Sequence, residues 1–298
     1  METALQGLEY RHVDVFTREA LSGNGVIIFP EADGLTPEMM QRITREMRQF
    51  ESIFLAPTTE IHHVGARVFT MEEELPFAGH PVLGAACVLH ERLYYVGDAD
   101  ERAEWTLELP VRPVQVSTIR REGWYEATMN QGRPQFGATL GAEMVGRVLA
   151  ALNLEEGDLY PNLPLEVVST GLPYLLVPLA SGLERAAIVQ PGFEELLASV
   201  GAKFVYVLHL PTREGRTWDN DGRVEDVATG SAAGPVGAYL VRHGLASAEE
   251  EITLEQGRFL GRPSQLRVRV DGADGDGGEI AAVYVTGDAR MVARGVFE

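Results

Sequence analysis

Residues 225–234 (EDVATGSAAG) combine an acid pair, a Thr-Gly-Ser turn and a run of small residues. The apolar residues that follow predict a helix closed by Gly244 as its C-cap. A helix that starts from such a turn presents backbone N–H groups without intrahelical acceptors, together with the positive end of its dipole. The stretch therefore indicates an anion-binding turn. Purely structural strand-to-helix turns share this pattern, so other parts of the chain must decide between the two interpretations.

Two further stretches carry residues that could do chemistry. Glu51 enters an apolar run at residues 50–55 (FESIFL), so it is either an exposed edge residue or a buried acid with a raised pKa. Residues 75–81 (LPFAGHP) form a turn with Gly79 and His80, and this turn leads into a predicted helix over residues 82–89.

The two turns lie about half a chain length apart and have similar surroundings. Residues 67–69 precede Gly79 and a small-residue helix, and residues 216–218 precede Gly230 and another such helix. A repeat of this size indicates duplicated domains, each presenting a helix N-terminus. If the halves face each other, a cleft between the two N-termini would suit an anionic ligand such as a carboxylate.

The periodicity of apolar residues predicts the helices and strands that must position these residues. Thr36 and Pro37 predict a helix start, with Thr as N-cap and Pro at the first helical position. A loop rich in Gly and Asp is expected at residues 271–278. Further helices are expected at residues 140–153 and 191–200, and strands at residues 8–17, 26–29, 66–70, 105–109, 111–116, 124–129, 166–169, 174–177, 203–208, 216–218, 266–270, 280–285 and 291–296.

Composition limits the class of protein. The 298 residues suffice for two domains, and 45% hydrophobic with 23% charged residues is ordinary for a globular protein. A formal net charge of −19 argues against binding nucleic acid or anionic membranes. The chain shows neither a long apolar run nor a signal-peptide pattern, so we expect a cytoplasmic protein without membrane partners.

The remaining reactive side chains favour structural roles. Cys87 is the single cysteine and lies in an apolar helical pattern, so we expect an inert buried thiol and no disulfide within the chain. His62 and His63 lack a third ligand and helical spacing, so we expect a surface loop and no metal site. Ser231 has no Gly-x-Ser-x-Gly elbow around it, which argues against a serine hydrolase.

Several of these blocks, in the same order along the chain, resemble the PhzF-like isomerase family of the phenazine-biosynthesis type. They span nearly the whole sequence, and the blocks at residues 75–81 and 228–232 are the most specific. The matching blocks are residues 13–17 (VDVFT), 22–24 (SGN), 45–51 (REM…E), 74–84 (ELPFAGHPVLG), 225–232 (EDVATGSA), 256–257 (QG) and 261–264 (GRPS).

The resemblance implies an α+β protein with the diaminopimelate epimerase-like fold. Two similar domains would each wrap a mixed β-sheet around a central helix, with the active site in the cleft between them. We place the N-terminal domain at residues 1–118 plus 283–298 and the C-terminal domain at residues 119–282. The central helices would begin near Pro81 and Ala232. The family also implies a homodimer.

The family resemblance assigns the site as well. Its isomerase moves a proton on a small carboxylate substrate without metal or organic cofactor. The catalytic glutamate corresponds to Glu51, and the histidine and aspartate of the cleft correspond to His80 and Asp226. Gly79, Gly230 and Ser231 would bind the substrate. An acid at an apolar edge suits proton transfer near neutral pH, because desolvation favours its neutral form.

The chain also departs from the family pattern. A small hydroxyl residue usually precedes the glutamate and Thr follows it, whereas Phe50 and Ser52 stand here. Val227 replaces the proline after the aspartate, and Gly25 replaces the proline of the Gly-Asn-Pro turn. A common Gly-Gly pair appears as Thr286-Gly287, and residues 216–220 lack the usual Phe-Ala-Pro. These differences leave the substrate open.

We therefore expect a cofactor-independent isomerase that shifts a proton, and with it a double bond, on a small carboxylate-bearing substrate. A ligand-binding protein with the same cleft but no turnover is an alternative, as is an epimerase or dehydratase on the same scaffold. Epimerases of this fold use two facing cysteines, whereas the turn positions here hold His80 and Ser231. Two-thiol chemistry is therefore not expected.

Overall fold

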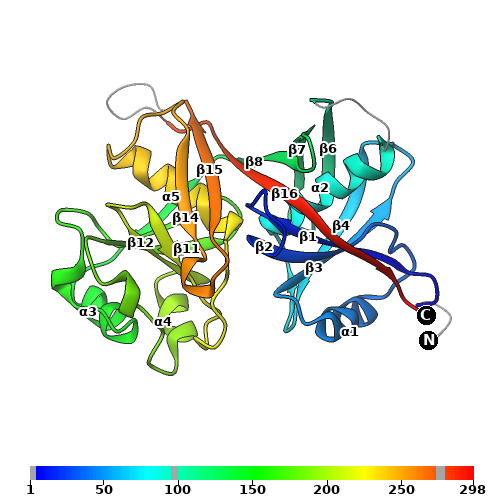
Figure 1. The fold of residues 1–298 in the computed structure, drawn as a ribbon. Coiled ribbons are helices and arrows are strands. Elements are labelled where there is room, and N and C mark those ends of the chain that lie inside the picture. Colours follow the sequence, from blue (N-terminus) through cyan, green and yellow to red (C-terminus); the bar gives the residue numbers. More distant parts are fainter. Residues whose placement is uncertain (1–4, 95–99, 273–278) are drawn as a thin grey trace. The chain divides into compact units, whose positions relative to one another are not determined.

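The computed structural model describes residues 5–94, 100–272 and 279–298, which divide into two compact units (Figure 1). The first unit comprises Met1–Asn130 and Thr286–Glu298, and the second comprises Gln131–Val285. The chain passes from the first unit to the second within strand β8 and returns within strand β16.

The first unit contains a mixed sheet. Its strands follow the order β1-β2-β3-β4-β6-β7-β8-β16, and β16 also pairs with β1, so the sheet closes on itself. The pairs β2–β3 and β4–β6 are parallel, and the short strand β5 pairs with β4. The elements that begin in this unit are β1 (Glu9–Val15), β2 (Asn24–Phe29), α1 (Pro37–Met47), β3 (Glu51–Pro57), β4 (His63–Thr70), β5 (Glu74–Leu75), α2 (His80–Leu93), β6 (Arg102–Glu108), β7 (Pro113–Arg120) and β8 (Tyr125–Gly132).

Helix α2 is the core of this unit. It packs against β1, β2, β3, β6 and β7, and its residues are buried from His80 to Val88. A helix that is apolar on every side must be enclosed, and its small residues allow strands to approach from several directions. Gly84 shows how tight the packing is, because a Cβ there would lie 3.1 Å from Val26 and 3.2 Å from Val15. Helix α1 covers a second cluster that includes Met40, Ile43, Phe54 and Phe69.

The second unit also contains a mixed sheet and one buried helix. Its strands follow the order β16-β15-β14-β13-β12-β11-β10-β9, with parallel pairs β11–β12 and β13–β14. The elements are β9 (Gln135–Thr139), α3 (Ala142–Ala151), β10 (Glu166–Ser169), β11 (Pro173–Leu179), α4 (Phe193–Ser199), β12 (Phe204–His209), β13 (Glu214–Arg216), α5 (Gly230–Arg242), β14 (Ile252–Gln256), β15 (Ser264–Asp271) and β16 (Ala282–Val296).

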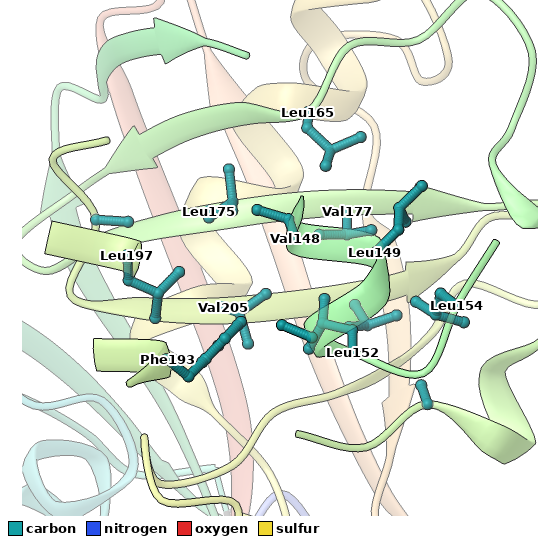
Figure 2. Packing of buried hydrophobic residues seen from close by; sticks show 14 of the residues in the cluster. Val148, Leu149, Leu152, Leu154, Leu165, Leu175, Val177, Phe193, Leu197 and Val205 are labelled. Atoms are coloured by element: carbon teal, nitrogen blue, oxygen red, sulfur yellow. The ribbon is translucent and has the colours of Figure 1, made fainter. Parts of the chain in front are cut away.

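Helix α5 is the buried helix of the second unit. It packs against β15, β10 and β11, and it is buried from Gly230 to Leu240. Successive side chains along β11 point to opposite faces of the sheet. Tyr174 reaches Ser231 of α5, whereas Leu175 and Val177 belong to a cluster with helices α3 and α4. Figure 2 shows this cluster, in which Val148 and Phe193 from the two helices meet the strand residues.

The sequence predicted most of these elements. Thr36 caps α1 by accepting a hydrogen bond from the backbone N–H of Met39, and the strand at 166–169 coincides with β10. Gly244 follows the C-cap of α5 with a φ of 70°, as a helix-terminating glycine should. Residues 273–278 of the expected loop at 271–278 lie outside the described residues.

Some boundaries were wrong. Helix α2 begins at His80, inside the segment expected to be a turn, and α5 begins at Gly230. The expected strand at 216–218 ends at Arg216, because Trp218 makes only an isolated bridge with Glu225. The two tail strands at 280–285 and 291–296 are one continuous strand, β16.

Candidate active site

Glu51 is the first residue of β3, and the parallel pairing of β2 with β3 places it opposite Val26. Asn24, the first residue of β2, therefore lies at the same end of this strand pair. Glu51 is 8% exposed and Asn24 is 2% exposed. Of the two interpretations that the sequence allowed for Glu51, the buried acid is the one observed.

His80 opens α2 beside these two residues. Its Nδ1 lies 3.8 Å from Oε2 of Glu51 and 3.4 Å from Nδ2 of Asn24. The ring is 3% exposed. We call Asn24, Glu51 and His80 the first polar cluster. Three segments that are distant in sequence form it, because β2 and β3 pair in parallel and α2 packs against both strands.

The imidazole of His80 is neutral over the ordinary pH range. Burial lowers its pKa to about 3, and a hydrogen bond with the backbone of Gly25 only partly offsets this effect. Nε2 is buried and has no hydrogen-bond partner among the described residues. A neutral ring can donate from one nitrogen and accept at the other, so Nε2 can meet a polar group of a ligand.

The second unit contributes a second polar cluster, which we define as Asp226, Thr229, Gly230 and Ser231. All four residues are buried, and Asp226 is 5% exposed. The hydroxyl of Thr229 donates to Oδ2 of Asp226 at 2.6 Å. The oxygen Oγ of Ser231 lies 2.7 Å from the hydroxyl of Tyr174. These contacts fix the turn that leads into α5.

Neither buried helix is capped by a side chain. The N-cap of α2 is Gly79 and that of α5 is Thr229, and neither accepts a side-chain cap hydrogen bond from its helix. Helix α1, by contrast, is capped by Thr36. Pro81 has no N–H, and the N–H groups of Val82 and Ala232 donate to the backbone oxygens of Gly79 and Thr229. The candidate anion donors are therefore the N–H groups that come before these, and the helix dipoles favour negative charge at both helix starts.

The structure thus brings the predicted residues together in two groups. Glu51, Gly79 and His80 meet in the first unit, whereas Asp226, Gly230 and Ser231 meet in the second. Sequence reasoning missed Asn24, Thr229, Gln256 and Tyr174 as members or supports of the site. The first three lie within the quoted family blocks, which was a usable signal.

The surroundings of Gly25, which replaces the proline of the family pattern, are crowded by side chains. A Cβ on Gly25 would lie 2.9 Å from Nε2 of His12 and 3.1 Å from Oε1 of Gln49. These two side chains thus occupy the space that a larger residue at position 25 would need. Gly25 lies on β2 between Asn24 and Val26, so the replacement of proline by glycine lies directly beside the first polar cluster.

The other reactive side chains have structural surroundings. Cys87 is fully buried, which confirms the expected burial, and burial raises the pKa of its thiol, which disfavours the reactive thiolate. His62 stacks on Trp105 with ring centroids 4.8 Å apart. His63 begins β4 and lies 2.6 Å from Glu108, so the expected surface loop was wrong for this residue. Within the described ranges, no group of three or more His, Cys, Asp or Glu side chains could hold a metal ion.

Membrane insertion by a helix has no support in the described part of the chain. None of the helices within residues 5–94, 100–272 and 279–298 combines the length and apolar character that a bilayer span requires.

The fold of each unit, a mixed sheet around one buried helix, defines the class of protein as diaminopimelate epimerase-like, which confirms the expected fold class. A hydroxyproline epimerase from Agrobacterium vitis, solved with bound trans-4-OH-L-proline, shares this fold with a TM-score of 0.65 at 12% identity, over 98% of this chain and 92% of the other. A structure from Pseudomonas aeruginosa described as a predicted epimerase superposes with a TM-score of 0.89 at 48% identity, covering 97% and 99% of the two chains.

The sequence identifies the family within this class. A family model described as phenazine biosynthesis-like protein matches residues 13–295. The trans-2,3-dihydro-3-hydroxyanthranilate isomerase of Pseudomonas aeruginosa is 33% identical over 296 residues, which cover 96% of this chain and 98% of that protein. An uncharacterized isomerase of Clostridium acetobutylicum is 31% identical over 94% of both chains. The chain belongs to the phenazine biosynthesis-like family, and it is an isomerase of the PhzF type.

Proposed function

We propose that this protein shifts a proton, and with it a double bond, on a small carboxylate-bearing substrate, with Glu51 as the general acid and base. The observation that carries the proposal is the buried contact between Glu51 and His80, 3.8 Å apart where β3 and α2 begin. A buried carboxyl exchanges protons at a higher pH than an exposed one, because desolvation disfavours its charged form.

The proposed reaction has two proton transfers. The carboxylate of Glu51 takes a proton from a substrate carbon, and the electron pair of that C–H bond moves into the carbon framework as the double bond shifts. The protonated Glu51 then returns the proton to a different carbon, which restores the carboxylate. No oxidant, reductant or metal is needed for this balance. Neutral His80 orients Glu51 and meets a polar substrate group through Nε2.

The substrate carboxylate would bind to backbone N–H groups rather than to a cationic side chain. His80 cannot serve as a cation near neutral pH, because burial holds its pKa at about 3. The donors that fit a carboxylate are the backbone N–H groups at a helix start, those of Gly79 at α2 and those of Gly230 and Ser231 at α5. We further propose that Asp226 holds a hydroxyl or amino group of a substrate.

The relative from Pseudomonas aeruginosa suggests the first substrate to test, which is trans-2,3-dihydro-3-hydroxyanthranilate. We expect turnover in D2O to place deuterium on carbon in the product. Glu51→Gln should abolish this incorporation and still bind the substrate, as measured by calorimetry. Glu74→Gln is the matched control, since it removes a carboxylate of the same unit that pairs with Arg67. Full turnover by the Glu51→Gln variant would refute the assignment.

The neighbour described as a predicted epimerase favours a second candidate. The same glutamate would then take the proton, and a different partner would return a proton to the opposite face of the same carbon, which inverts the stereocentre. Product analysis separates the two outcomes, because an epimerase leaves the double bonds unchanged whereas an isomerase moves one. We further propose that the protein is a homodimer, which analytical ultracentrifugation tests directly.

A further inference from the structure

A buried glutamine supports Asp226 in the second unit. Gln256 ends β14 and is 1% exposed. Its Nε2 donates to the backbone oxygen of Asp226 at 2.9 Å and to Oγ1 of Thr229 at 3.0 Å. Its Oε1 accepts from the backbone N–H of Thr229 at 3.1 Å and from the hydroxyl of Tyr206 at 3.2 Å. Two donors and two acceptor positions are thus all in use, which exhausts the capacity of a side-chain amide.

The orientation of this amide follows from its partners. A backbone carbonyl can only accept, and a backbone N–H can only donate. The carbonyl of Asp226 therefore requires Nε2 on its side, and the N–H of Thr229 requires Oε1 on the other. Tyr206 agrees with this orientation, because burial and the nearby acids Asp226 and Glu214 raise its pKa and keep its phenol a donor.

The amide orientation decides where the proton of Thr229 goes. A hydroxyl has one proton, and the oxygen of Thr229 already accepts from Nε2 of Gln256. The proton is therefore directed to Oδ2 of Asp226, at 2.6 Å. This length is typical of a hydroxyl that donates to an ionised carboxylate. A hydrogen bond of this kind favours the charged form of the acceptor.

Thr229 does not cap its helix through its side chain, because its hydroxyl is bonded to Asp226 and Gln256. A threonine at an N-cap normally accepts a hydrogen bond from the second or third N–H of its helix, as Thr36 does in α1. Thr229 is the N-cap of α5 and makes no such bond. Its hydroxyl donates to Asp226 instead, so the side chain of Thr229 does not cap the first N–H groups of α5. One arrangement thus supports both the acid and the open helix end.

We propose that Gln256 and Thr229 are positioning residues for Asp226. The amide of Gln256 directs the hydroxyl proton of Thr229 onto Oδ2 of Asp226, and this holds the side chain ionised and in one orientation. The relevance of this relay to turnover rests on the proposed function, because it assumes that Asp226 binds the substrate. The relay itself is a property of the folded second unit.

The charged groups around this network are mostly paired with one another. Arg216 of β13 binds both carboxylate oxygens of Glu225 at 2.9 and 2.6 Å. Arg258, which follows β14, binds both oxygens of Glu214 at 2.9 and 2.8 Å. Tyr206 of β12 is neutral. The hydroxyl of Thr229 is thus a neutral donor to the carboxylate of Asp226. The two acids near Asp226, which are Glu225 and Glu214, already bind arginines.

The test measures the ionisation of Asp226 directly. Protein labelled with 13C at the aspartate carboxyl carbon is titrated by NMR, and the Asp226 signal is assigned by its loss in Asp226→Asn. We expect Thr229→Val to raise the midpoint of Asp226 by about one pH unit, because one hydrogen bond to the charged form is lost. Thr229→Ser should keep the original midpoint.

Two further variants sharpen this result. Gln256→Glu should also raise the midpoint, because the new carboxylate accepts the proton of Thr229 and repels Asp226. Thr44→Val is the matched control, because it removes a buried hydroxyl that donates to a carbonyl in the first unit. An unchanged midpoint in Thr229→Val would overturn the proposal. If Gln256→Glu does not fold, the Val and Ser variants at position 229 still decide the question.

A parallel measurement separates this proposal from the proposed function. The pH profile of deuterium incorporation should shift to higher pH on its acid side in Thr229→Val and stay in place in Thr229→Ser. If the wild-type protein shows no incorporation, the proposed function fails and the NMR titration still decides the relay. If turnover is present and the midpoint of Asp226 does not move in Thr229→Val, the relay fails alone.

Discussion

Nδ1 of His80 lies 3.8 Å from Oε2 of Glu51, and the two side chains do not form an ion pair near neutral pH. Burial lowers the pKa of His80 to about 3, so the ring is neutral near neutral pH. The ring therefore faces the carboxyl of Glu51 as a neutral dipole rather than as a cation. His80 is held at the start of helix α2, and Glu51 is held at the start of strand β3.

The first prediction concerns the coupling of this pair. We expect Glu51→Gln to lower turnover by at least about 100-fold, in line with the loss of a general acid–base group. His80→Gln should lower turnover by about 10- to 100-fold, since it removes the ring that orients the glutamate. The double variant should resemble Glu51→Gln alone, because the two residues act as one unit. Steady-state kinetics of the four proteins would contradict this prediction if the two losses simply multiply.

The second prediction concerns stability in acid. His90 is fully buried and lies 2.8 Å from the hydroxyl of Thr118, and burial lowers its pKa from 6.5 to about 4. Between these values the unfolded chain binds a proton that the folded protein does not, so stability falls as the pH falls below about 6.5. Each such histidine contributes about 1.4 kcal/mol per pH unit. His80 adds to this slope down to about pH 3.

His90→Gln isolates this contribution. The free energy of unfolding, measured in urea at several pH values, should depend less steeply on pH in the variant. We expect the slope between pH 6 and 4.5 to decrease by about 1.4 kcal/mol per pH unit, whatever the absolute stability of the variant. Equal slopes in the two proteins would show that His90 is not held neutral by the fold.

The third prediction compares two glycines in the connection from β14 to β15. Gly257 has a φ of 87°, and a Cβ there would lie 2.2 Å from the oxygen of Arg262 and 2.8 Å from that of Val227. Gly261 has a φ of 67° with no atom within 4 Å of such a Cβ. Gly257→Ala should lose about 3 kcal/mol or more, because backbone strain and steric clash add. Gly261→Ala should lose only about 1 kcal/mol, from its left-handed backbone alone. Similar losses in urea denaturation would be inconsistent with this packing.

The fourth prediction concerns Arg216, whose guanidinium binds both oxygens of Glu225 and also donates to the carbonyl oxygens of Leu183 and Ala186. Arg216→Lys should lose about 2–3 kcal/mol, because one ammonium group cannot reproduce this planar set of bonds in a buried position. Arg133→Lys should change stability by less than about 1 kcal/mol, because its pair with Glu279 is exposed. Thermal unfolding of the two variants checks the difference.

Much of the fold was accessible from local patterns. The Thr36-Pro37 start of α1 and the glycine after α5 depend on backbone geometry within a few residues, so sequence is sufficient to predict them. The strand expected at 216–218 failed because the chain leaves the sheet after Arg216, where Thr217 bonds to the oxygen of Val205. That hydroxyl bond joins the residue after β13 to a residue of β12, and no local pattern encodes it.

The sequence by itself determined the family and the two glycine turns that lead into the buried helices. It left open whether Glu51 is exposed or buried, and it gave no role to Thr229. Only the tertiary structure decided these points. Parallel pairing of β2 with β3 buries Glu51 against the end of α2, and Gln256 turns the hydroxyl of Thr229 towards Asp226. Burial and hydrogen-bond direction depend on residues far apart in the chain, so they exist only once the chain has folded.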